Sequence, residues 1–157
     1  MIRFLRADGA AWVGNFQRSS PQGFDGVVDH PDGRQVIVVA GGEGYVVDPE
    51  SQRQTHSFGE GMINFAQRVP DLNMVVIGNG TELAAFSANG AGWNSERISW
   101  DGMRDITITA TILRGEAWSP VSKAWHPFEV DLLTGKSRGA VYGEQMAGAV
   151  RVSPHRP

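Results

Sequence analysis

The chain carries the run VIVVAGGEGYVVDP at residues 36–49, and this stretch decides the fold class. Five apolar residues, Val36–Ala40, stand directly before a glycine cluster, which is typical of a β-strand covered on both faces. Gly41–Gly44 predicts a turn, and Tyr45–Val47 predicts a returning strand that ends at Asp48-Pro49. The stretch therefore predicts a buried antiparallel hairpin.

The same order of features recurs three times along the chain. An apolar strand, a turn rich in glycine or asparagine, a second strand and a corner led by aspartate or serine fill residues 26–58, 63–98 and 106–142, a period of roughly 40 residues. In the first unit, the polar segment Gln54–Phe58 predicts an outer strand that meets water. Strands of decreasing apolarity are what a β-propeller blade requires. We therefore expect an all-β fold of antiparallel β-meander repeats, with about three propeller-like units.

The third unit has the clearest strand pattern. Ile106–Ile112 alternates apolar residues with threonine, which is the period of a half-buried strand. Arg114–Trp118 continues a hairpin that Ser119-Pro120 closes, and Trp125–Leu132 forms the next strand. Val141-Tyr142 is expected to finish the unit.

An N-terminal hairpin precedes the repeats. Residues 1–16 hold two short apolar runs on either side of Asp8-Gly9, which predicts a type I′ turn with positive φ at both central residues. Residues 151–157, at the other end, are expected to fray. A chain of 157 residues with 41% hydrophobic residues is expected to form one domain over residues 1–157.

Two points of the architecture stay open. Met62–Arg68 fits a strand, but it also fits two turns of helix, which would interrupt the second repeat. A closed propeller needs about four or more blades, so three units leave exposed sheet edges. A wrapping N-terminal hairpin, an open sandwich or the association of two chains would each protect those edges. We favour a curved or split β structure that is open or incomplete, with a homodimer as an option.

Composition excludes several classes of site. The chain has no cysteine, which removes disulfides, thiolate zinc sites, iron–sulfur clusters and cysteine nucleophiles. The formal net charge is −3 and no basic stripe appears, so no nucleic-acid partner is expected. Asp8 interrupts the N-terminus before a signal-type apolar stretch builds, and no run approaches the roughly 20 apolar residues of a membrane span. A cytoplasmic location without membrane contact is expected, with a periplasmic one as the alternative.

The part of the chain from Ser99 onward resembles a known group of sequences. Its motifs are SWDG at 99–102, GEAW at 115–118 and PFEVDLLTG at 127–135. These motifs are similar to those of small uncharacterised bacterial proteins with propeller-like β repeats, a group with no known activity. The order of Asp131 before Thr134-Gly135 is also similar to the strand ends of many bacterial propeller blades. The resemblance implies blade-like repeats and points to no known activity.

The tryptophans are the main aromatic candidates for function, and they stand at positions 12, 93, 100, 118 and 125. A tryptophan in an all-β fold most often fills a gap between sheets, so core packing is the default interpretation for each. Tryptophan is also enriched at interface hot spots. Trp125 is the best candidate for contact with a partner, because His126 and Pro127 adjoin it. Trp93, next to Asn94, comes second.

Two carboxylates of the third unit are further candidate partner contacts. Asp101 precedes Gly102 and most simply forms a turn in which the glycine takes positive φ. Glu116 lies in an expected strand and points either to water or into a cleft. A buried glutamate would need a partner such as Arg104 or Arg114. We favour a structural ion pair for Glu116 over a general-acid role.

The first repeat is locally acidic and adds three more candidates for contact with a partner, in a segment that also holds Asp32: Asp25, Asp29 and Glu43. A solvated acidic face of this kind could attract a basic partner or a calcium ion, although an EF-hand loop is absent. The four histidines are dispersed and lack the spacing of a metal site. We therefore expect no metal and no cofactor.

These observations favour a non-catalytic protein-binding module. No catalytic constellation is recognisable, and aromatic and acidic residues stand in loop-like segments. Small, mildly acidic bacterial proteins often act as immunity or inhibitor proteins, so a basic toxin domain is the partner that analogy suggests. One alternative is a hydrolase that uses Asp101, Glu116 and His126 in a cleft. The other is a structural β protein that self-assembles through exposed edges.

Overall fold

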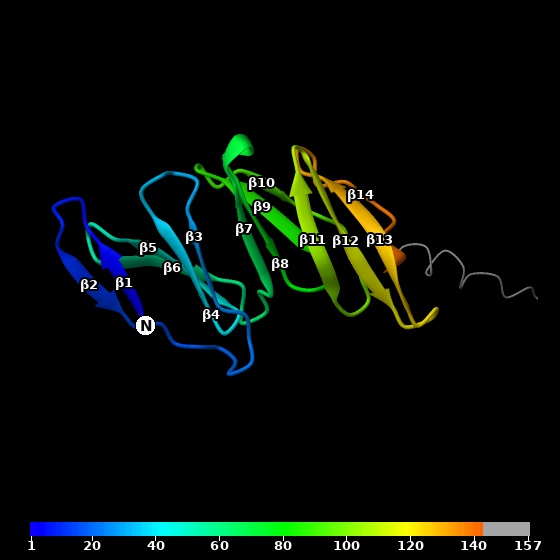
Figure 1. The fold of residues 1–157 in the computed structure, drawn as a ribbon, viewed down its shortest axis with the longest axis horizontal. Coiled ribbons are helices and arrows are strands. Elements are labelled where there is room, and N and C mark those ends of the chain that lie inside the picture. Colours follow the sequence, from blue (N-terminus) through cyan, green and yellow to red (C-terminus); the bar gives the residue numbers. More distant parts are fainter. Residues whose placement is uncertain (143–157) are drawn as a thin grey trace, which may run out of the picture. The chain divides into compact units, whose positions relative to one another are not determined.

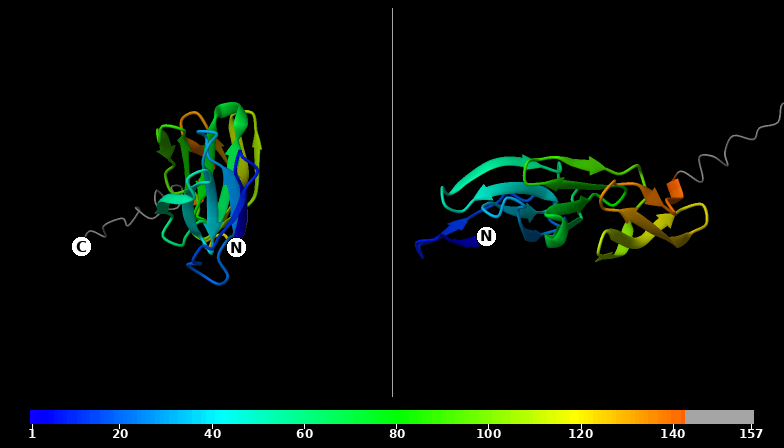
Figure 2. Two further views of the ribbon diagram at one scale, coloured as in Figure 1. Left: turned by 90° about the vertical axis from the view of Figure 1, so that its left-hand side faces the viewer. Right: turned by 90° about the horizontal axis from the view of Figure 1, so that it is seen from above.

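The computed structural model describes residues 1–142 and shows an all-β chain, as predicted (Figure 1). Within these residues the strands form four antiparallel sheets, one of two strands and three of four. Strands that follow one another in the sequence are neighbours in every sheet (Figures 1 and 2). The described residues divide into two compact units, residues 1–80 with 84–93 and residues 81–83 with 94–142.

The N-terminal hairpin is present, but its turn is not of the predicted type. Strands β1 (Ile2–Leu5) and β2 (Ala11–Gly14) pair antiparallel. Gly9 has a φ of 82°, whereas Asp8 stays outside the positive-φ region, so the type I′ prediction is wrong. The N–H of Arg6 lies 2.9 Å from the carbonyl oxygen of Ala10, which closes a three-residue loop instead. Such loops combine a type I turn with a final residue of positive φ.

The first four-stranded sheet has the order β3-β4-β5-β6. Its strands are β3 (Gly26–Asp29), β4 (Val36–Ala40), β5 (Glu43–Asp48) and β6 (Arg53–Phe58). Gly41 and Gly42 have φ of 57° and 86°, so positive φ at both central residues occurs in the turn between β4 and β5. β6 is exposed along most of its length, as predicted for a polar outer strand.

Strand β4 is covered on both faces, as its apolar run predicts. On one face, Ile37 and Val39 belong to a buried cluster with three further residues, one from β5, one from the segment that leads into the second sheet and one from that sheet: Val46, Ile63 and Val75. On the other face, Val38 packs with Phe4 of the hairpin and Val47 of β5. Apolar burial on both sides of this sheet therefore holds the first unit together.

The second four-stranded sheet has the order β10-β9-β8-β7. Its strands are β7 (Phe65–Val69), β8 (Met74–Gly78), β9 (Leu83–Ser87) and β10 (Gly92–Asn94). The helical alternative for Met62–Arg68 is wrong, because this segment runs into β7. A short 3₁₀ turn, Pro70–Leu72, joins β7 to β8. β10 is short and ends at Asn94.

The third four-stranded sheet has the order β11-β12-β13-β14. Its strands are β11 (Met103–Thr109), β12 (Ile112–Ser119), β13 (Ala124–Asp131) and β14 (Ser137–Arg138). The strand predicted over Ile106–Ile112 is interrupted at Ala110, whose φ is 52° and which begins the turn into β12.

The last strand of the third unit is not where the sequence predicts it. The outer strand is β14, whereas Val141 and Tyr142 take a helical conformation. The N–H of Val141 donates to the carbonyl of Ile98 at 3.0 Å, so this segment is tied to the loop before β11 instead of to the sheet. Residues 151–157, which were expected to fray, lie outside the described residues.

Aspartates cap the corners that follow several strands. Asp48 Oδ1 accepts the N–H of Glu50 at 2.9 Å and of Ser51 at 3.2 Å. The Ser51 and Glu50 N–H groups hold the pKa of Asp48 below its ordinary value. Burial raises the pKa of Asp32, but hydrogen bonds from backbone N–H groups of its own turn outweigh that effect and lower it overall. The predicted rhythm of aspartate-led corners thus has a local cause, since each carboxylate satisfies the N–H groups of its own turn.

Replacing Gly42 by alanine is expected to destabilise the first unit more than replacing Gly33. Both glycines have positive φ, 86° and 71°, which costs an L side chain roughly 1–2 kcal/mol. A Cβ at Gly42 would also lie 2.2 Å from the carbonyl oxygen of Gly61, whereas a Cβ at Gly33 would meet nothing within 4 Å. Urea unfolding measures both variants, and equal losses of unfolding free energy would contradict this packing.

The free energy of unfolding is expected to fall as the corner aspartates are protonated. A carboxyl whose pKa is lowered by folding stabilises the chain above its unfolded pKa and loses that contribution as the pH falls through its folded pKa. The window therefore begins near the ordinary value of 3.8 and extends below it. Asp48→Ala should reduce the loss of stability between about pH 6 and about pH 3, measured by urea unfolding.

Asp29→Ala is the matched control for the pH experiment. Asp29 is exposed at the end of β3, and its carboxylate accepts no hydrogen bond from a backbone N–H within residues 1–142. Its replacement removes a carboxylate but no hydrogen-bonded corner. If Asp48→Ala and Asp29→Ala change the acid-induced loss of unfolding free energy equally, the hydrogen-bonded corner does not cause the acid sensitivity.

Candidate functional site

One face of the third sheet carries polar and aromatic side chains instead of a core. Successive residues of a strand point to opposite faces, and the register pairs Leu113 with Val130 on the packed face. On the other face Glu116 lies opposite Pro127, and Trp118 lies opposite Trp125. We call this surface the Trp118–Trp125 face, made up of seven residues from β11, β12 and β13: Arg104, Arg114, Glu116, Trp118, Trp125, Pro127 and Glu129.

Two tryptophans and an arginine are in direct contact on this face. The rings of Trp118 and Trp125 have centroids 5.4 Å apart and an interplanar angle of 56°. The guanidinium carbon of Arg104 lies 4.3 Å from the ring centroid of Trp125, which is a cation–π contact. Both indoles are half-buried, so part of each ring meets solvent.

Glu116 is held by the same arginine. Its Oε2 atom lies 2.8 Å from the Nε atom of Arg104, and the side chains are 35% and 49% exposed, respectively. The Oδ2 atom of Asp105 lies 3.5 Å from the same Nε. The structural ion pair predicted for Glu116 is therefore present, and Arg104 provides it.

A local irregularity of β11 accompanies this contact. The register of β11 against β12 shifts between Arg104 and Thr107, and Asp105 within the shift has a φ of 52°. A bulge of this kind bends the strand and changes the direction of a side chain. The bulge thus separates the Arg104–Glu116 pairing from the regular pairing that begins at Thr107.

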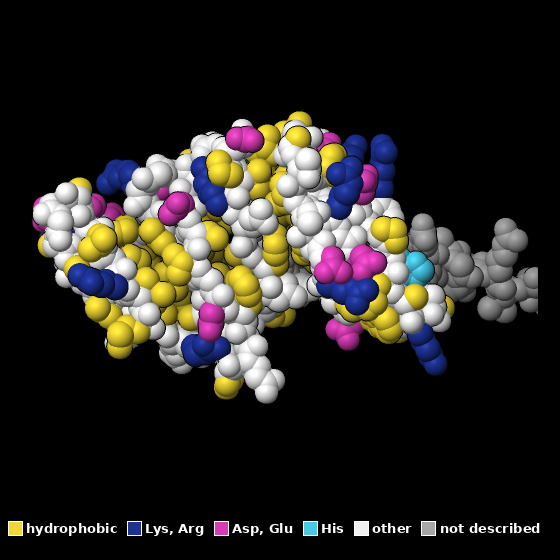
Figure 3. Space-filling view, viewed as in Figure 1, with side chains coloured by type: hydrophobic (Ala, Val, Ile, Leu, Met, Phe, Trp, Pro, Cys, Tyr) yellow, Lys and Arg dark blue, Asp and Glu magenta, His cyan; other side chains and the backbone are white. Residues whose placement is uncertain are grey.

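A second ion pair lies on the same face. Nε of Arg114 is 2.6 Å from Oε1 of Glu129, its cross-strand neighbour. Figure 3 shows basic and acidic side chains side by side over β11 to β13, with hydrophobic side chains next to them. Charges here are paired across strands, so the face has no strong single sign.

His126 does not belong to the Trp118–Trp125 face. It lies opposite Ala117, on the packed side of the sheet, because it is the neighbour of Trp125 along the same strand. Its Nε2 atom lies 2.6 Å from the hydroxyl oxygen of Ser122 in the turn before β13. The expected patch of Trp125 with His126 is thus split between two faces.

The proposed hydrolase cluster is split in the same way. Glu116 and His126 project from opposite faces of the sheet. Asp101 is exposed in the loop before β11, and Gly102 beside it has the positive φ, 101°, that its turn was predicted to need. Glu116 and His126 therefore do not meet in one pocket.

The acidic candidates of the first unit are largely engaged in structure. Asp25 pairs with Arg18, and its Oδ1 accepts the N–H of Gly41 at 2.8 Å. The Gly41 hydrogen bond and the Arg18 guanidinium lower the pKa of Asp25. Glu43 Oε2 accepts the N–H of Gly61 at 2.9 Å. Asp29 remains an exposed carboxylate, and Trp93 lies half-buried in β10 of the second sheet.

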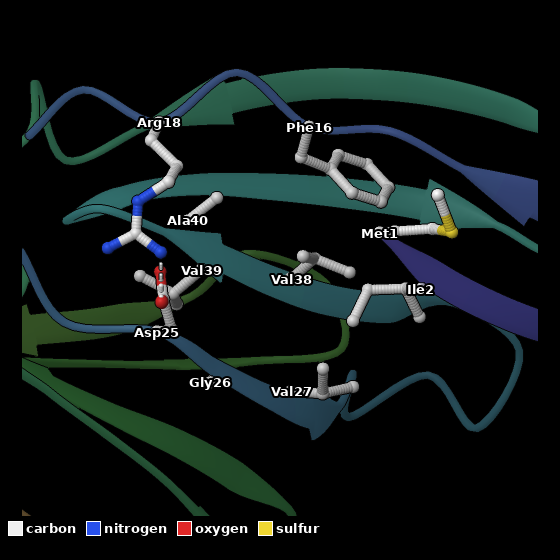
Figure 4. A pocket seen from close by; sticks show the side chains of 10 residues that line it. All are labelled: Met1, Ile2, Phe16, Arg18, Asp25, Gly26, Val27, Val38, Val39 and Ala40. Carbon is white, nitrogen blue, oxygen red and sulfur yellow. Dashed lines mark hydrogen bonds and ion pairs between the residues drawn. The ribbon is translucent and has the colours of Figure 1, made fainter. Parts of the chain in front are cut away.

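A hydrophobic pocket of about 400 Å³ lies between the hairpin and the first sheet (Figure 4). Met1, Ile2, Phe16 and Val27 gather at one end, and the paired side chains of Arg18 and Asp25 lie at the other (Figure 4). Figure 3 shows hydrophobic side chains gathered over β1 to β4. Because its two charged groups already pair with each other, the pocket offers a ligand mainly apolar contact.

The described residues show neither a metal centre nor a membrane-spanning helix. No three His, Asp or Glu side chains of residues 1–142 come together as a set of metal ligands. In that same part of the chain, no helix has the length and apolarity to span a bilayer. Comparison with protein families, with curated proteins and with solved structures finds no match to this chain.

Proposed function

We propose that this chain is a non-catalytic protein-binding module that contacts its partner through the Trp118–Trp125 face. The observation that carries the proposal is the contact of two half-exposed indoles, with Arg104 stacked on Trp125. Tryptophan and arginine are the residue types most enriched at interface hot spots. The rigid, partly apolar indole of tryptophan gains contact area at a low cost in side-chain entropy.

We further propose that the three four-stranded meanders are propeller-like units of an open or incomplete set. Each is made of four consecutive antiparallel strands, which is the connectivity of a propeller blade. The exposure of β6 in the first unit supports an outer-strand role. The resemblance to small bacterial proteins with propeller-like repeats points to the same arrangement.

We propose that the partner is a basic protein. In this proposal the chain acts as an immunity or inhibitor protein, and the partner is a bacterial toxin that it neutralises. The chain has a formal net charge of −3, which favours encounter with a basic protein. The carboxylates Asp25 and Glu43 bind groups of their own unit, so they add less to recognition than the sequence suggests. The immunity role itself rests on analogy alone.

Self-association is a separate proposal with its own test. A homodimer or larger assembly through sheet edges would appear in light scattering as a mass that rises with concentration. A mass of one chain at every concentration would remove this alternative. The hydrolase alternative gains no support from the geometry, since Glu116 and His126 lie on opposite faces.

Alanine substitution of Trp118 or Trp125 is expected to abolish stoichiometric capture of a protein partner. Truncating a hot-spot residue typically costs about 2 kcal/mol or more, which is roughly 30-fold in affinity. The experiment uses the immobilised chain and an extract of the organism that encodes it, followed by affinity measurement with the captured protein. His56→Ala, in exposed β6, is the control and should keep full binding.

Two results would count against the proposed function. A wild-type chain that captures no stoichiometric protein would contradict the protein-binding function. If a partner is captured equally by the wild type and both tryptophan variants, the Trp118–Trp125 face is not the binding surface.

A further inference from the structure

The guanidinium of Arg104 occupies a place with all the features of a cation-binding site. An indole face, that of Trp125, lies 4.3 Å from its central carbon. Two carboxylates, Glu116 and Asp105, lie 2.8 Å and 3.5 Å from its Nε atom. An aromatic face beside carboxylates is the arrangement with which proteins hold arginine and quaternary ammonium groups.

This arrangement combines a weakly stabilising ion pair with a strained backbone residue. The Arg104 and Glu116 side chains are 49% and 35% exposed, and ion pairs this exposed contribute little to stability. Asp105, which adjoins the arginine, has a φ of 52°, in the left-handed region that costs a non-glycine residue conformational energy. Strain of this kind concentrates at functional sites.

We propose that Trp125, Glu116 and Asp105 form a subsite for an arginine side chain of the protein partner, and that Arg104 is its resident occupant. On binding, the partner's guanidinium takes the place of Arg104 over the indole and pairs with the carboxylates. Arg104 then turns to solvent. The exchange replaces one cation–π contact and two ion pairs by equivalent ones, so the carboxylates are not left unpaired.

The subsite favours a guanidinium over an ammonium group. A guanidinium is planar, so it can stack on Trp125 and still direct N–H groups to Glu116. The ring of Trp118 is tilted by 56° against the same indole, with its centroid 5.4 Å away, and adds apolar surface beside the subsite. An ammonium group is more strongly hydrated and has no flat face to stack. This inference rests on the proposed protein-binding function and names the partner chemistry that its surface recognises.

The test removes the resident cation and supplies a free one. Arg104→Ala is titrated with the acetylated, amidated peptide Gly-Arg-Gly and, separately, with the glutamine and lysine peptides of the same form. Binding is followed by tryptophan fluorescence and by calorimetry. The arginine peptide should bind Arg104→Ala at least about 10-fold more tightly than it binds the wild type, since one cation–π contact with an ion pair is involved. Glu116→Gln in the same background should remove most of that gain.

Arg114→Ala is the matched control. Arg114 makes the same kind of cross-strand ion pair, to Glu129 at 2.6 Å, but its guanidinium does not stack on an indole in residues 1–142. This variant loses the same charge from the same face without exposing an aromatic subsite. It should gain no affinity for the arginine peptide. Arg104→Gln, which keeps much of the aliphatic stem, repeats the test if the alanine variant is less stable.

Three outcomes would overturn the inference. Equal gains in Arg104→Ala and Arg114→Ala would mean that only net charge matters. A glutamine peptide that binds as well as the arginine peptide would exclude a cation subsite. A lysine peptide that binds as tightly would contradict the preference for a guanidinium. If any of these occurs while partner capture still depends on Trp118 and Trp125, the inference fails and the proposed function stands.

Discussion

The register of one hairpin, β12 with β13, is the constraint on which the candidate site depends. Ser119 lies opposite Ala124 at the turn, so Trp118 falls opposite Trp125 and Glu116 opposite Pro127. Leu113 and Val130 then share the packed face, where both are fully buried. A slip of one residue would exchange the two faces and expose that core. Apolar burial on one side therefore fixes which side chains meet on the other.

The two units use their charged residues differently. In the first unit, Asp25 and Glu43 accept backbone N–H groups and tie loops to the sheet. In the third sheet, Glu116 and Glu129 pair with arginines on an exposed face and bind no backbone. The first use stabilises the fold, whereas the second leaves charged groups that another molecule can reach. The carboxylates of Glu116 and Glu129 are therefore better placed to bind a basic partner than those of the first unit.

Much of the fold follows from local sequence. Val36–Ala40 is a β-branched run before two glycines, and it forms a strand covered on both faces. The errors lie where backbone conformation is set by residues with weak preferences. The turn between β11 and β12 begins at Ala110, whose φ is 52°. This residue lies inside an Ile/Thr pattern, and no glycine or asparagine marks the turn in the sequence. At Asp8, loop closure over three residues replaced the expected two-residue turn.

The candidate site was only partly predictable. Trp125 and Glu116 were identified from residue type, but the expected neighbour of Trp125, His126, faces the other way. Trp118 could have been found, because it and Trp125 stand at equal distances from the turn that closes their hairpin. Arg104 was named as a possible partner of Glu116, but its contact with the Trp125 ring could not be predicted, since it lies beside a bulge at Asp105 that has no marker in the sequence. Pairings across strands need the register, and composition does not supply it.

The most direct test of the central claim is an NMR measurement of the five indole N–H groups in the Arg104→Ala variant as the arginine peptide is added. The signals of Trp118 and Trp125 should shift together and saturate. Trp12, whose indole N–H donates to the Pro49 carbonyl at 2.9 Å, should not move. Shifts confined to Trp12 or Trp93, or no shift at any tryptophan, would contradict the account.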